Sequence, residues 1–111
     1  MLEHIKIRGF EKVKDFAMST TDAPQGLPNG ALLDQGDSEH FTNEVKRVVI
    51  RVENAPIRIG FGNIVPDQAG NGFLVNINET FVFSSFAEAK AAQIASANTG
   101  FPAKVSIIAY Y

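Results

Sequence analysis

The sequence predicts an all-β fold: an antiparallel β-sandwich or barrel, jelly-roll-like, with an N-terminal arm and at most a short helix. The first observation is the stretch 48–63, VVIRVENAPIRIGFGN, in which two short alternating segments meet at an Ala-Pro step. The second is that six or more such segments are separated by turn-forming residues about every eight to twelve positions, a spacing typical of sandwiches and barrels. The third is the content of nine phenylalanines, most of which we expect inside.

The N-terminal residues 1–44 are expected to form an arm and a loop that pack on or beyond the domain. Residues 2–8 alternate apolar and charged side chains, which fits a short strand or an extended arm. Residues 10–18 space apolar side chains by three and four, so they permit one or two helical turns, although a strand through Val13 fits as well. Residues 19–30 contain two prolines and two glycines and are expected to form a loop that is long for a compact domain.

Residues 45–111 are expected to form the body of the sandwich, within one domain overall. Residues 45–53 alternate apolar and polar side chains, the pattern of a half-buried strand. Pro56 ends this strand and keeps Ala55 out of the helical region, so a second strand begins after it. The side chains expected in the core are those on the inner faces of the two strands: Val48, Ile50, Val52, Ile57, Ile59 and Phe61.

Glycine and turn residues divide the next part of the chain. Gly60 and Gly62 indicate a bulge or a close backbone approach at the end of the second strand. A turn cluster at 66–72 leads into two strands of about five residues, at 73–77 and 80–83, which are joined by a further turn.

The segment 87–97, AEAKAAQIASA, is ambiguous. Its composition favours a helix, whereas its few apolar residues also alternate as in a narrow strand. We expect a helical turn at 86–91, followed by a strand at 92–96. Residues 103–111 alternate again, so we expect them to close the chain as a strand.

The composition excludes several classes of protein. With 45% hydrophobic and 20% charged residues, the chain resembles an ordinary globular domain. Its apolar runs are far shorter than the roughly 20 residues that span a bilayer, and no pattern of a signal peptide opens it. A formal net charge of −2 argues against nonspecific nucleic-acid binding, and the lack of cysteine excludes disulfides and thiol catalysis. We therefore expect no direct nucleic-acid partner and no membrane partner.

Charge is distributed unevenly along the chain. The charged residues from 59 to 111 are Asp67, Glu79, Glu88, Lys90 and Lys104 only. A small domain with a nearly uncharged half is a candidate for burial against neighbouring molecules.

The residues that could carry chemistry do not form a recognisable catalytic or metal-binding motif. Asp34, Asp37 and Glu39 lie beside His40, but they lack the order of a calcium-binding EF-hand loop, so we interpret them as a solvated acidic turn. His4 and His40 have no metal-ligand spacing. The pair Ser84-Ser85 lacks the GxSxG environment of a hydrolase and is interpreted as part of a turn. We expect no catalytic residue, no cofactor and no metal, and therefore no enzyme.

The run VVIRVENAPIRIGFGN, the later FLVNINETFVF and the final AKVSIIAYY resemble the small β-sandwich structural proteins of tailed bacteriophage virions. This resemblance covers residues 45–111. It implies a non-catalytic virion protein, either a capsid decoration or cement protein that stabilises the capsid lattice, or a head-tail or tail accessory protein. The implied partners are the major capsid protein or other virion proteins, and the implied location is the virion, assembled in the host cytoplasm.

Exposed charges and tyrosines are the candidate interface of such a protein. If the strands on either side of Pro56 pair, Arg51 and Arg58 lie close together on the outer face and can meet an acidic turn of another copy in a homo-oligomer. The alternative is that these arginines only solvate the sheet. The full set of candidate interface residues is Arg47, Arg51, Arg58, Asp34, Asp37, Glu39, Tyr110 and Tyr111.

A ligand-binding or cell-surface-binding β-sandwich is the second class of function. Sugar sites rely on flat aromatic side chains. The chain has no tryptophan, and its two tyrosines are adjacent at positions 110 and 111, which argues mildly against sugar recognition.

Overall fold

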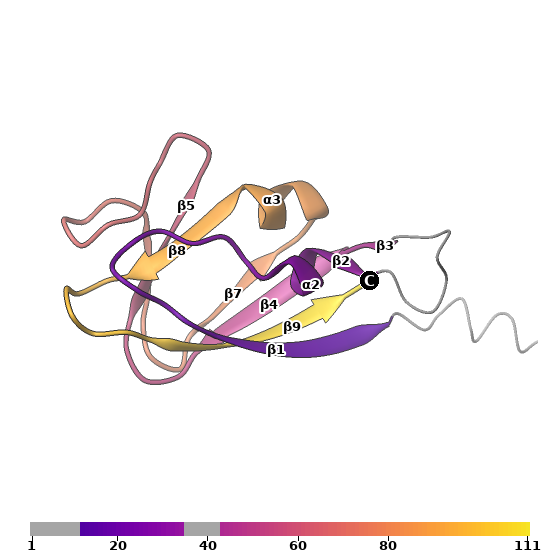
Figure 1. The fold of residues 1–111 in the computed structure, drawn as a ribbon, viewed down its shortest axis with the longest axis horizontal. Helices are drawn as coiled ribbons and strands as arrows, with labels where there is room; N and C mark the ends of the chain where they lie inside the picture. Colours follow the sequence, from indigo (N-terminus) through magenta and orange to yellow (C-terminus); the bar gives the residue numbers. More distant parts are fainter. Residues whose placement is uncertain (1–11, 35–42) are drawn as a thin grey trace, which may run out of the picture.

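The computed structural model describes residues 12–34 and 43–111 and confirms the all-β prediction as a two-layered antiparallel sandwich, not a closed barrel (Figure 1). Sheet A has the strand order β1, β9, β4, β7, and sheet B has the order β6, β5, β8. The strands of sheet A are β1 (Val13–Ser19), β9 (Lys104–Tyr110), β4 (Arg47–Val52) and β7 (Thr80–Phe83). Those of sheet B are β6 (Phe73–Val75), β5 (Ile57–Phe61) and β8 (Ala92–Ser96). Two further short strands pair with each other, and two short helices complete the fold: β2 (Leu33–Asp34), β3 (Asn43–Glu44), α2 (Asn29–Leu32) and α3 (Phe86–Ala91).

The Ala55-Pro56 step sends β4 and β5 into different sheets. Proline has a fixed φ and no N–H, so it interrupts the hydrogen-bonding of a strand and allows the chain to change layer. The inner side chains of both strands then meet between the sheets, as predicted. Val48, Ile50, Val52, Ile57 and Ile59 are fully buried, whereas Phe61 is only partly buried.

Strand β1 is part of sheet A, although the sequence places it within the N-terminal arm. It pairs with β9 over seven residues, from Val13 opposite Tyr110 to Ser19 opposite Lys104. Its burial alternates, with Lys14, Phe16 and Met18 toward the core. The strand alternative for this segment is therefore the one observed, and the helical one is wrong. The sandwich begins before residue 45.

The ambiguous segment near residue 90 divides as predicted, into helix α3 and strand β8. The Oγ of Ser85 accepts a hydrogen bond from the Glu88 N–H at 3.1 Å, and Oε1 of Glu88 accepts one from the Ser84 N–H at 2.7 Å. This capping arrangement fixes the start of the helix and confirms the turn role of the two serines. Neither helix in the described part of the chain is long and apolar enough to cross a membrane.

The phenylalanines are less buried than predicted. Among those in the described residues, Phe83 alone is fully buried. It packs in a cluster with Phe61, Phe73 and Phe81, in which neighbouring ring centroids lie 5.1–6.4 Å apart. Since β6 and β7 are edge strands of their sheets, this cluster closes the open side of the sandwich and stays partly exposed there.

The connection between β5 and β6 is the loop 62–72, which begins with a tight turn in which the Ile64 N–H donates to the Phe61 carbonyl at 3.0 Å. Gly60 is buried beside the carbonyl oxygen of Ile64, which confirms the close backbone approach expected at this glycine. Asp67 accepts hydrogen bonds from the N–H groups of Ala69 and Asn71 and from the Asn71 side chain. The Asn71 side-chain hydrogen bond is the main reason why the pKa of Asp67 lies below its usual value.

Candidate interaction surface

The surface of sheet A that faces away from sheet B is the main candidate for an interface, and its residues follow from the strand register. Directly opposed residues in an antiparallel pair point to the same side of the sheet. Three rows of outward-facing residues therefore cross the sheet: Val13, Tyr110 and Arg47; Asp15, Ile108, Val49 and Val82; and Ala17, Ser106, Arg51 and Thr80. A fourth row contains Ser19 and Lys104, which oppose one another in β1 and β9. Glu53, just after β4, extends this row, because the Glu53 N–H donates a hydrogen bond to the Lys104 carbonyl at 2.9 Å. We call these residues the outer face.

The centre of the outer face is apolar. Ile108, Val49 and Val82 are adjacent across β9, β4 and β7. Ile108 is 37% exposed and Val82 is 45% exposed, so a substantial part of this row meets solvent in the isolated chain. Adjacent apolar side chains on a sheet surface are more informative than a single exposed one, because they form a continuous area that a partner can cover.

Arginine and tyrosine side chains flank the apolar row. The guanidinium carbon of Arg47 lies 4.1 Å from the centroid of the Tyr110 ring, within the range of a cation–π contact. Arg51 donates a hydrogen bond to Oδ1 of Asn78 at 3.4 Å and is exposed. Arginine and tyrosine are enriched among the residues that contribute most to protein interfaces.

A shallow hollow of about 420 Å³ lies at the end of the outer face. Ser106 donates a hydrogen bond to Oε2 of Glu53 at 2.6 Å within it. The hollow is lined by Ala17, Met18, Ser19, Glu53, Lys104, Val105 and Ser106. Its polar groups include both a carboxylate and an ammonium group.

The predicted proximity of Arg51 and Arg58 is wrong, because their strands belong to different sheets. Arg58 is half-buried in sheet B and donates a hydrogen bond to the Gly72 carbonyl at 3.0 Å. This contact ties β5 to the start of β6, so Arg58 supports the turn and lies outside the outer face.

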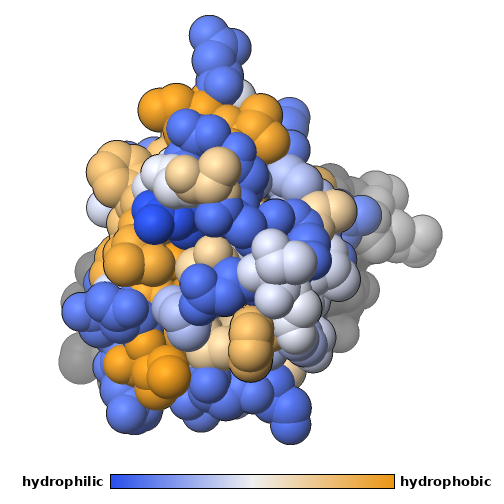
Figure 2. All heavy atoms as spheres, turned by 90° about the vertical axis from the view of Figure 1, so that its left-hand side faces the viewer, coloured by the Kyte–Doolittle hydropathy of each residue, from blue (hydrophilic) through white to orange (hydrophobic). Residues whose placement is uncertain are grey.

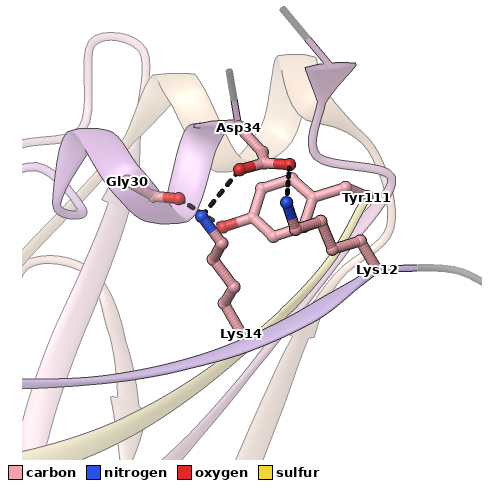
Figure 3. A network of polar contacts seen from close by, with 5 residues as sticks. All are labelled: Lys12, Lys14, Gly30, Asp34 and Tyr111. Carbon is pink, nitrogen blue, oxygen red and sulfur yellow. Dashed lines mark hydrogen bonds and ion pairs between the residues drawn. The ribbon is translucent and has the colours of Figure 1, made fainter. Parts of the chain in front are cut away.

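Asp34 is buried, which overturns its interpretation as part of a solvated turn. Its side chain is 1% exposed and contacts Nζ of Lys14 at 2.6 Å and Nζ of Lys12 at 3.2 Å (Figure 3). The two ammonium groups reach it from β1 and from the residue just before β1, and they compensate the buried negative charge. Asp37, Glu39 and His40 lie outside the described residues.

Tyr111 completes the cluster in Figure 3, so this predicted interface residue is buried. Its hydroxyl donates a hydrogen bond to the Gly30 carbonyl, and Nζ of Lys14 lies 6.0 Å from its ring centroid. Burial, and secondarily the negative charge of Asp34, raise the pKa of Tyr111 above its ordinary value of 10.0. The cluster joins β1, α2, β2 and the residue after β9, so its role is structural.

Tyr111→Phe is expected to lower the free energy of unfolding by about 1 kcal/mol at neutral pH, since it removes the hydrogen bond to Gly30. A raised pKa in the folded state means that the folded protein keeps its phenol proton where the unfolded chain has lost it. The tyrosine therefore stabilises the fold fully below pH 10 and progressively less as the pH rises through its folded pKa. Urea unfolding at neutral and alkaline pH should show a steeper alkaline loss for the wild type than for Tyr111→Phe. Tyr110→Phe is the matched control, and an equal alkaline loss in wild type and Tyr111→Phe would contradict the prediction.

The apolar residues of the outer face were missed as interface candidates. Alternation in the sequence places the apolar residues Val49 and Ile108 on the outward side of their strands, and this was the signal that could have identified them as interface residues. The register that brings them together with Val82 joins distant parts of the chain and cannot be read from alternation alone.

The end of the sandwich that carries the β5–β6 and β8–β9 connections differs from the outer face, because its exposed apolar residues do not form one continuous row. Figure 2 shows separate groups of apolar side chains there, with hydrophilic ones between them. Ile64, Val65 and Phe101 are exposed in the loops of the described chain. Within residues 12–34 and 43–111, no group of three or more His, Asp or Glu side chains is placed to hold a metal ion.

No protein-family model, curated protein or solved structure matches this chain.

Proposed function

We propose that this protein is a non-catalytic structural subunit that acts by binding other subunits of a particle, most specifically a capsid decoration or cement protein of a tailed bacteriophage. The observation that carries the proposal is the apolar row of the outer face, flanked by Arg47, Arg51 and Tyr110. An apolar centre with arginine and tyrosine beside it matches the anatomy of protein interfaces. The resemblance of residues 45–111 to virion β-sandwich proteins supports the virion as the particle.

Two alternatives differ in the partner. A head-tail or tail accessory protein uses the same kind of surface against a different virion component. A ligand-binding or cell-surface-binding module is favoured by the hollow that Glu53 and Lys104 line, because charged residues of both signs in one hollow suit a small polar ligand. The hollow is shallow and the apolar row lies beside it, so we favour a protein partner.

The first test is the genome neighbourhood, which should encode a major capsid protein, and the second test uses DNA-free capsids assembled from that capsid protein. The purified protein should sediment with these capsids and saturate at a fixed ratio of subunits. A genome neighbourhood that lacks capsid and tail genes, or a protein that stays in the supernatant with capsids and with isolated tails, would overturn the proposal.

Arg51→Glu is expected to leave the domain folded and to weaken capsid binding by about tenfold, equivalent to about 1.4 kcal/mol. The reason is that a reversed charge beside the apolar row opposes whatever acidic group the arginine meets. Lys90→Glu is the matched control, because it makes the same charge change on the exposed surface of α3. Equal binding of wild type and Arg51→Glu, measured by sedimentation, contradicts a role for this face.

A further inference from the structure

The two central strands of the outer face carry complementary side chains, row by row. On β9 these are Tyr110, Ile108, Ser106 and Lys104, and on β4 and just after it they are Arg47, Val49, Arg51 and Glu53. In the first row an aromatic ring lies beside a guanidinium group, and in the second two apolar side chains are neighbours. In the third row a hydroxyl lies beside a guanidinium group, and in the fourth an ammonium group has a carboxylate as its neighbour. The same face carries both halves of every pair.

A surface of this kind is self-complementary about one particular axis. A two-fold axis that runs parallel to the strands, between β4 and β9, keeps each row in place and exchanges the two strands. It therefore lays β9 of one copy over β4 of the other. Ile108 then faces Val49, Tyr110 faces Arg47 and Lys104 faces Glu53, each contact occurring twice, as an isologous interface requires.

We propose that a second copy of this chain covers the outer face, about a two-fold axis parallel to the strands between β4 and β9. The proposal rests on the proposed function in one respect: both assign the outer face to contact between protein subunits, with the second copy covering this face in the free protein and the capsid replacing that copy on binding. Two sheets packed face to face with their strands within about 30° of one another is a common arrangement. Because each sheet is twisted, the contact is centred on β4 and β9 and opens toward β1 and β7.

The positions of the charged residues favour a two-fold axis parallel to the strands over one perpendicular to them. A two-fold axis perpendicular to the strands, through the row of Ile108 and Val49, would place Arg47 of one copy over Arg51 of the other. Like charges in contact across an interface are unfavourable. The parallel axis instead brings opposite charges together at Lys104 and Glu53.

At about 4.8 Å between strands and 3.4 Å per residue, the two strands at the centre of the contact, β4 with six residues and β9 with seven, present a projected area on the order of 200 Å². This is well below the roughly 800 Å² that each partner buries in a standard interface. We therefore expect a dimer that dissociates on dilution. Sedimentation velocity should be measured over a concentration range that reaches on the order of several hundred micromolar.

The decisive test is a pair of charge reversals, Glu53→Lys and Lys104→Glu. Each single variant places like charges opposite one another twice, so each alone should dimerise at least tenfold more weakly than the wild type. When the two variants are mixed, every reversed residue meets an opposite charge on the other chain, and a heterodimer should form. This outcome depends on contact between chains, because the mismatch within each chain persists in the mixture.

Three outcomes overturn the inference: a wild type that is monomeric throughout the range, single variants that dimerise as tightly as the wild type, or a mixture that remains monomeric. If either charge variant unfolds, Val49→Asp decides the matter, with Phe101→Asp as the control on an exposed loop position. Loss of self-association in Val49→Asp, with retention in Phe101→Asp, is expected, and equal behaviour of the two overturns the inference.

Self-association and capsid binding are separate measurements, so the two proposals can fail separately. A monomer that binds capsids refutes the dimer and keeps the structural function. A dimer that binds neither capsids nor tails keeps this interface and refutes the virion role.

Discussion

Replacing Phe83 by alanine is expected to lower the free energy of unfolding by about 3–5 kcal/mol. Phe83 is fully buried on β7, and its ring centroid lies 5.8 Å from that of Phe61 and 5.1 Å from that of Phe81. The truncation removes buried apolar surface and leaves a cavity that the two flanking sheets cannot fill. Domains of this kind are stable by only about 5–15 kcal/mol, so the urea midpoint should fall markedly.

Phe101→Ala is the matched control for this prediction. Its side chain is 63% exposed, so the same truncation should change stability by no more than about 0.5 kcal/mol. Similar losses in both variants would show that the buried ring of Phe83 contributes no more to stability than an exposed one. Circular dichroism in urea, with the slope of the transition held common, measures both.

The elements that could be predicted from the sequence are those whose structure is determined by residues close together in the chain. Alternation with a period of two is a property of neighbouring residues, so the core positions Val48, Ile50, Ile57 and Ile59 could be read directly. The division of the segment near residue 90 into α3 and β8 was also predictable, since helix propensity and alternation are both properties of neighbouring residues. The start of α3 has a local cause as well, because the cap formed by Ser84, Ser85 and Glu88 lies within five residues of sequence.

The elements that were missed depend on contacts between distant segments. The apolar spacing of residues 10–18 permits a helical turn as well as a strand, and the pairing of Val13–Ser19 with β9 decides in favour of the strand. Asp34 has acidic neighbours in sequence, yet it is buried, and its charge is compensated by Lys12 and Lys14, of which Lys14 lies 20 residues earlier in the chain. Sequence spacing carries no information about such approaches.

The candidate surface was predictable only in part. Arg47, Arg51 and Tyr110 were selected for charge and ring chemistry, and they lie on the outer face. Arg58 has the same chemistry but lies in sheet B, since the chain changes layer at Pro56. The pairing of rows across β9, β4 and β7, on which the proposed interface depends, is set by register and not by composition.

Replacing Gly60 by alanine is expected to destabilise the domain by about 3 kcal/mol, a large effect for one added methyl group. A Cβ at this position would overlap the carbonyl oxygen of Ile64 and lie 2.8 Å from Cδ of Pro66. The first of these atoms belongs to the backbone and the second to a rigid ring, so a side-chain rotation cannot relieve the overlap. The end of β5 and the turn after it must move apart, which also disturbs the Arg58 contact with Gly72.

Gly26→Ala is the control for the added methyl group. A Cβ there would meet only the Ala92 carbonyl oxygen at 3.9 Å, an ordinary contact, so stability should stay the same or rise slightly because the unfolded chain loses freedom. Hydrogen exchange of amides in β5 and β6 should increase in Gly60→Ala while that in β1 and β9 changes only with global stability. If Gly60→Ala unfolds at the same urea concentration as Gly26→Ala, the close approach at Ile64 does not constrain the fold, and the sharp turn after β5 must have another cause.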